Sequence, residues 1–118
     1  SGTAVLLADD PQLLALSQYC DGQVTLFSKS ASTPALTAHV AAGHRAVFMD
    51  HGQLVMAEGA RRHNLCNMSA ISCTKQAQDH QQICNVLAAA AAAWALGVSI
   101  ELIEAGLLGF NPNTALPA

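Results

Sequence analysis

The chain has few charged residues, and this limits the kinds of protein it can be. Charged residues make up 11% of the 118 residues, against about 25% in an average soluble domain. Because so little of the surface can be charged, the chain is not expected to be an independent monomer. We expect it to pack against more protein.

Basic residues are scarce as well. Lys and Arg together number five, the formal net charge is −3, and Arg61 and Arg62 form the one adjacent basic pair. A nucleic-acid face needs clustered basic side chains that contact phosphates. The composition therefore argues against nucleic acid as a partner.

A long apolar run and an export signal are also missing. The longest apolar run, 86–98, has 13 residues even when its glycine is counted, whereas a membrane-spanning helix needs about 20. No charged start followed by an apolar stretch is found at the N-terminus, so no secretory signal is predicted. We expect a cytoplasmic protein without a membrane role.

The cysteines do not form a disulfide or metal-binding framework. Without paired spacing or an export signal, the four cysteines are expected to be reduced thiols. Structural zinc sites use pairs such as Cys-x2-Cys with His-x3-5-His, and the loops among His63, Cys66, Cys73, His80 and Cys84 do not fit that pattern. Neither a metal site nor a nucleophile motif is predicted.

The first third of the chain contains clear turn and capping signals. The continuous apolar run 4–8 is typical of a strand buried in a parallel sheet. Asp10 as cap and Pro11 in the first turn predict a helix to about Tyr19, and a strand over 23–27 completes a βαβ unit. The helix residues expected to face inward are Leu13, Leu16 and Cys20.

The middle of the chain predicts strands joined by tight turns. A second cap-and-proline signal indicates a short helix over 34–42. The runs 45–49 and 53–57, joined by the turn 50–52, predict a β-hairpin. A third strand is expected over 65–71.

Six consecutive alanines at 88–93 predict a packing helix that ends at Gly97 and follows a polar loop over 74–79. Ser99 is placed to cap a last helix, which should end near Gly109. The apolar stripe of the alanine helix comprises Ile83, Leu87, Ala90 and Trp94. In the last helix we expect Ile100, Ile103 and Leu107 to face inward and Glu101 and Glu104 to face outward. This order predicts an α/β fold with a mixed sheet, parallel at its first strand.

Three polar residues stand where a ligand could bind. Asn85 is an amide among apolar residues, and it is either a core or capping amide or a ligand contact. Asp9 and Asp10 follow a predicted parallel strand, where open α/β sheets place ligands. The alternative for Asp10 is a helix cap.

Taken together, these motifs resemble the Mur-ligase-like part of cyanophycin synthetase. The family has an Asn-Ala-Asp-Asp-Pro turn after a strand, and an Asn-x-Leu-Ala-Ala helix that ends in Ala-Leu-Gly. The segments that carry the resemblance are 2–11, 24–28, 34–43, 45–48, 50–52, 57–59 and 85–97.

The resemblance implies part of an ATP-dependent amide ligase. Such enzymes use ATP and Mg²⁺ to phosphorylate a carboxylate, and an amine then displaces the phosphate; in cyanophycin synthetase, arginine is joined to the side-chain carboxylate of poly-aspartate. Asn85 matches the asparagine that contacts adenine, and Gln82 matches a nearby nucleotide-side glutamine. Asp9 and Asp10 are a weaker pair of candidates.

The chain also departs from the family pattern. Leu7 stands where the family has asparagine. The 118 residues contain no Gly-x-x-x-x-Gly-Lys-[Ser/Thr] loop, which would cradle phosphates, and they lack the family's magnesium-binding glutamate. We therefore expect 1–110 to be the second half of a central ATP-binding domain, and 111–118 a linker toward a C-terminal domain.

Several expectations about partners follow from the resemblance. The partners are the remainder of the ligase and an amino-acid or peptide substrate, and the complete enzyme should be a homo-oligomer. The chain alone should be inactive and hold no bound cofactor. The alternatives are another Mur-type ligase, for peptidoglycan or folylpolyglutamate, and a scaffold or binding module without catalysis.

Overall fold

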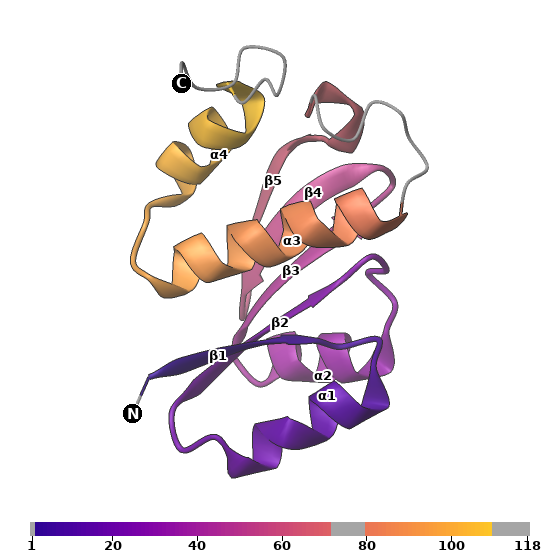
Figure 1. The fold of residues 1–118 in the computed structure, drawn as a ribbon, viewed down its shortest axis with the longest axis vertical. Helices are drawn as coiled ribbons and strands as arrows, with labels where there is room; N and C mark the ends of the chain where they lie inside the picture. Colours follow the sequence, from indigo (N-terminus) through magenta and orange to yellow (C-terminus); the bar gives the residue numbers. More distant parts are fainter. Residues whose placement is uncertain (1, 72–79, 110–118) are drawn as a thin grey trace, which may run out of the picture.

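The computed structural model describes residues 2–71 and 80–109. In this part of the chain, five strands form one mixed sheet in the order β1-β2-β3-β4-β5, with helices on both faces (Figure 1). The strands are β1 (Thr3–Leu7), β2 (Gln23–Ser28), β3 (Arg45–Asp50), β4 (Gln53–Glu58) and β5 (Arg61–Asn67). The helices are α1 (Pro11–Ala15), α2 (Pro34–Ala41), α3 (His80–Ala95) and α4 (Ile100–Gly109), with 3₁₀ segments η1 (Leu16–Tyr19) and η2 (Met68–Ala70). The predicted α/β class and mixed sheet are confirmed.

The predicted βαβ unit is present. β1 and β2 pair in parallel, and β2 pairs in parallel with β3. Asp10 caps α1, because its Oδ1 accepts hydrogen bonds from the backbone N–H groups of Gln12 (2.9 Å) and Leu13 (3.3 Å). The cap and the position of Pro11 are confirmed.

Of the three residues predicted to face inward from the first helix, Leu13 and Leu16 do not, whereas Cys20 is partly buried. Leu13 is 39% exposed and Leu16 is 49% exposed, and Tyr19 on the same segment is 78% exposed. Leu14 packs against the core instead. The helix is short and changes to 3₁₀ geometry, with three residues per turn. It lies against β1 at the edge of the sheet, so only a narrow stripe of its apolar side chains faces the core.

The hairpin of β3 and β4 follows the prediction. The two strands are antiparallel, and His51 (φ 50°) and Gly52 (φ 79°) occupy the two central positions of the turn with positive φ. Positive φ at both positions matches the right-handed twist of the flanking strands. The centre of β4, Leu54–Ala57, is completely buried.

The third predicted strand is displaced. We expected a strand over 65–71, whereas β5 spans Arg61–Asn67 and is followed by η2. The tight turn at Gly59, with φ 59°, returns the chain at once to pair with β4. The first four residues of this edge strand are polar and exposed, so apolar patterning does not detect them.

The alanine helix α3 covers one face of the sheet and contacts β1, β2 and β3. Its buried residues are Val86, Leu87, Ala90, Ala91 and Trp94, and Ile83 packs against the same cluster. Gly97 with φ 95° follows the helix and accommodates its left-handed C-terminal cap. The predicted stripe is confirmed and is wider by Val86 and Ala91.

The remaining helices complete the layers. α1 and α2 lie on the opposite face from α3 (Figure 1), where Leu36 of α2 is buried in the second core cluster. Ser99 caps α4, because its Oγ accepts from the N–H of Leu102 (3.2 Å). Ile103 is buried, and Ile100 and Leu107 pack on the core. The predicted loop 74–79 and linker 111–118 lie outside the described residues.

None of the described helices is long and apolar enough to span a bilayer.

Candidate functional site

Two predicted site residues, Gln82 and Asn85, lie together. They are three residues apart, about one helical turn, and both line a cavity of about 350 Å³ between α3, α4 and Ile71, the residue that follows η2. The other lining residues are Ile71, Val86, Ala89, Gly106 and Leu107. The cavity therefore has apolar walls and two amide side chains.

Asn85 is exposed rather than part of the core. Its Oδ1 accepts a hydrogen bond from Nε2 of Gln81 at 3.0 Å. The core-amide alternative is therefore wrong, and Asn85 lies within α3 rather than at its end. Its contact with a ligand stays a prediction.

A second, apolar cavity of about 230 Å³ continues along α3 and α4. It shares Ala89, Gly106 and Leu107 with the first cavity. The small side chains of the alanine run keep this space between the two helices open, because larger residues at these positions would fill it. The residues found only here are Ala90, Ala93, Val98, Leu102 and Ile103.

Asp9 and Asp10 do not line the cavity that contains Gln82 and Asn85. Asp10 is occupied as the cap of α1. Asp9 accepts hydrogen bonds at Oδ1 from Oγ of Ser28 (2.5 Å) and from Oγ1 of Thr33 (3.3 Å). These three side chains form a cluster where β1 and β2 end.

The sequence patterns did not identify Ser28 and Thr33 as partners of Asp9. Ser28 is completely buried, and its Oγ also accepts from the N–H of Ser30 at 3.0 Å. Thr33 stands at the cap position before Pro34 in the second cap-and-proline signal, yet its hydroxyl makes no capping bond. A serine that directly ends a buried parallel strand is the signal that could have identified Ser28.

One polar contact connects the end of β2 with the start of α3. Nζ of Lys29 donates a hydrogen bond to Nδ1 of His80 at 3.1 Å. Figure 1 shows the N-terminal end of α3 on the same side of the molecule as the carboxyl ends of β1 and β2. Gln82 and Asn85 lie in the first two turns of this helix, so the amide cavity lies near the carboxyl ends of these strands, where open α/β sheets bind ligands.

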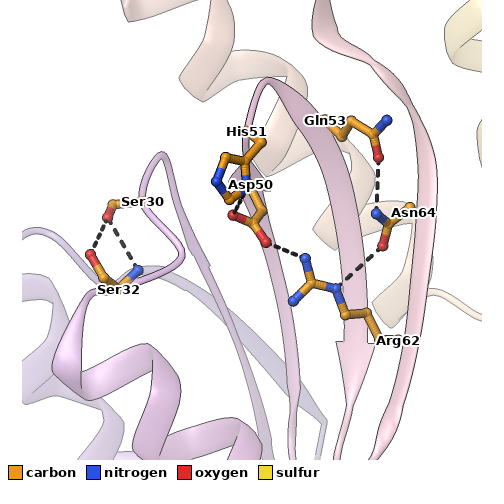
Figure 2. A network of polar contacts seen from close by, with 7 residues as sticks. All are labelled: Ser30, Ser32, Asp50, His51, Gln53, Arg62 and Asn64. Carbon is orange, nitrogen blue, oxygen red and sulfur yellow. Dashed lines mark hydrogen bonds and ion pairs between the residues drawn. The ribbon is translucent and has the colours of Figure 1, made fainter.

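A separate polar network crosses β3, β4 and β5 (Figure 2). Arg62 donates to the carboxylate of Asp50 and to Oδ1 of Asn64 (3.3 Å). Asn64 in turn donates to Oε1 of Gln53 at 2.9 Å, and the hydrogen bond from Arg62 lowers the pKa of Asp50. Because its members bind one another across strands, this network stabilises strand pairing.

The described residues contain no group of three or more His, Cys, Asp or Glu side chains that could hold a metal ion. Of the five residues considered for zinc, Cys73 lies outside residues 2–71 and 80–109.

Comparison with known proteins gives one group of relatives. No protein-family model matches the chain. Curated proteins named cyanophycin synthetase are similar to it: one from Geminocystis herdmanii is 34% identical over 112 residues, and one from a Nostoc species is 30% identical over 114 residues. A third, from a Synechocystis species, is 30% identical over 113 residues.

These matches cover 95%, 97% and 96% of this chain, respectively, but only 13% of each relative. The resemblance predicted from the motifs is therefore confirmed, and this chain is similar over nearly its whole length to one stretch of the cyanophycin synthetases.

Proposed function

We propose that this chain is part of an ATP-dependent carboxylate–amine ligase of the cyanophycin synthetase kind, and that it binds the adenine of the nucleotide. The observation that carries this proposal is the cavity with Gln82 and Asn85 on one side and apolar walls on the others. Curated relatives of the chain are named cyanophycin synthetase, which supports the ligase assignment.

The chemistry of the cavity suits a purine base. Its volume of about 350 Å³ lies in the range of small-molecule sites, about 300–1,000 Å³. The small residues Ala89 and Gly106 leave room for a flat ring. An asparagine or glutamine amide can both donate to and accept from the adenine edge, which supports a base contact for Asn85 and Gln82.

The residues of this chain fit the phosphates of ATP and the Mg²⁺ ion less well than they fit the base. Bound ATP would supply the phosphoryl group that activates a carboxylate for attack by an amine. The described residues contain no group of three or more His, Cys, Asp or Glu side chains that could hold a metal ion, and the sequence contains no phosphate loop. We therefore assign only the base contact to this chain.

The same proposal names the partner. We assign 1–110 to the second half of a Mur-ligase-like central domain and 111–118 to a linker. We also propose that the remainder of the ligase covers the exposed apolar side chains of this chain. Leu13 of α1 and Leu16 and Tyr19 of η1 are exposed. Leu96, which follows α3, and Leu102 in α4 are 84% and 66% exposed. Covering such side chains would be favourable, since each buried apolar side chain contributes about 1.5–3 kcal/mol.

The acid and amine that we propose are the side-chain carboxylate of poly-aspartate and arginine, as the resemblance to cyanophycin synthetase implies. The names of the relatives favour this over a peptidoglycan or folylpolyglutamate ligase and over a scaffold without catalysis.

The test is Asn85→Ala in the full-length natural protein. Losing one or two hydrogen bonds of about 0.5–1.5 kcal/mol each should raise the KM for ATP by about threefold to a hundredfold. The melting temperature should not change, because Asn85 is exposed.

Gln18→Ala, an exposed amide in η1, is the control and should leave the KM for ATP unchanged. An unaltered KM for ATP in Asn85→Ala would exclude the base contact.

A further inference from the structure

We infer that Gln81 is a positioning residue that sets which way the amide of Asn85 faces and thereby contributes to the choice of base. This inference rests on the proposed function, because it concerns the same contact with the nucleotide. Gln81 does not line the cavity, so its effect would be indirect.

The structural basis is the hydrogen bond from Nε2 of Gln81 to Oδ1 of Asn85 at 3.0 Å. The two residues are four apart on α3, the spacing at which side chains on a helix face one another. A bond from Gln81 to this oxygen turns Oδ1 toward Gln81 and places Nδ2 on the other side of the amide. The oxygen keeps a second lone pair for another donor.

The orientation of this amide matters because purines differ in donor and acceptor pattern. On the Watson–Crick edge, adenine presents the N6 donor beside the N1 acceptor, whereas a 6-oxopurine presents the O6 acceptor beside the N1–H donor. An asparagine that rotates freely by 180° about its last torsion can match either pattern. An asparagine held by Gln81 matches one of them, and in an ATP-dependent ligase that pattern is adenine's.

Two variants of Gln81 separate this role from packing. Gln81→Leu removes the donor, so the Asn85 amide is free to rotate. Gln81→Glu replaces the donor with a carboxylate that only accepts hydrogen bonds, so Asn85 should turn its Nδ2 toward position 81. Both changes are at an exposed position and should leave the melting temperature near that of the natural protein.

The experiment measures kcat/KM for ATP and for inosine triphosphate in the full-length protein. The ratio of the two should fall about three- to tenfold in Gln81→Leu, the effect of one hydrogen bond, and further in Gln81→Glu. Gln18→Glu, which adds the same charge in η1, should keep the natural ratio. Equal ratios in the natural protein and both folded Gln81 variants would overturn the inference.

A double-mutant comparison identifies the route of the effect. In an Asn85→Ala background, Gln81→Leu should no longer change the ratio, because the amide that it positions is gone. A change of the same size in that background would contradict positioning through Asn85. Asn85→Ala alone tests the proposed function. If this variant raises the KM for ATP while the Gln81 variants keep the natural ratio of kcat/KM values for the two nucleotides, only this inference is refuted.

Discussion

At the scale of single residues, His39 in α2 makes a contact that affects how the stability of the fold depends on pH. Its Nε2 donates a hydrogen bond to the backbone oxygen of Val24 at 2.7 Å, and its ring centroid lies 4.8 Å from that of His44. Burial lowers the pKa of His39 below 6.5, the hydrogen bond to Val24 opposes this, and the charge of His44 lowers it further. The net effect is a lowered pKa in the folded protein.

We therefore expect acid to destabilise the fold through His39. The unfolded chain binds the proton more readily than the folded one, so the free energy of unfolding should fall as the pH decreases through 6.5 toward the lower folded-state pKa. His39→Gln can still donate to Val24 but does not titrate. Urea unfolding at pH 7.5 and 5.5 should show a smaller loss of stability in this variant. Identical losses in both proteins would contradict the role of His39.

At the scale of elements, Arg45 connects the start of β3 to the C-terminal end of α3. Its guanidinium carbon lies 4.3 Å from the ring centroid of Trp94, and its Nη1 donates to the backbone oxygen of Trp94 at 3.3 Å. Its Nε is 3.3 Å from Oε1 of Glu58 but makes no hydrogen bond. The contact with Glu58 is therefore an ion pair without hydrogen-bond geometry.

Arg45→Lys should lower the free energy of unfolding by roughly 1–2 kcal/mol, because lysine lacks the planar group that stacks on Trp94 and reaches the helix end. Glu58→Gln removes only a partly exposed ion pair and should cost less, about 0–1 kcal/mol. Urea denaturation of both variants provides the comparison. A larger loss in Glu58→Gln would show that the ion pair, rather than stacking, joins these elements.

At the scale of the whole molecule, the sheet has an apolar edge. β1 is an edge strand, and its residues 4–7 are all apolar yet only partly buried. Leu13, Leu16 and Tyr19 are exposed on the segment that follows it. Natural proteins usually protect such an edge with charge or a covering element. This surface agrees with the low charge content of the chain and with the proposal that it packs on more protein.

We predict that the 118-residue chain alone does not catalyse ligation. With ATP, Mg²⁺ and a poly-aspartate primer, labelled arginine should not be incorporated above a blank without enzyme, because the sequence contains no phosphate loop. The full-length natural protein, assayed in parallel, is the positive control. Arginine incorporation by the 118-residue chain would contradict the proposal that the phosphate-binding residues lie in the remainder of the ligase.

Local signals in the sequence were sufficient for most elements. The caps at Asp10 and Ser99, the hairpin turn at His51 and Gly52, and the alanine helix depend on interactions within a few residues, so they could be predicted without knowledge of the fold. The motif order was also sufficient for the resemblance to cyanophycin synthetase. The roles of Gln82 and Asn85 remain predictions, although the structure places both at one cavity.

Contacts between distant segments decided the rest. The first four residues of β5 are polar and have no apolar pattern, so the place of this strand depends on pairing with β4 through the turn at Gly59. Leu13 and Leu16 are exposed because the sheet ends at β1. Ser28 and Thr33 bind Asp9 only after parallel pairing brings the ends of β1 and β2 together. A local pattern cannot encode these outcomes, because each depends on which neighbour the sheet supplies.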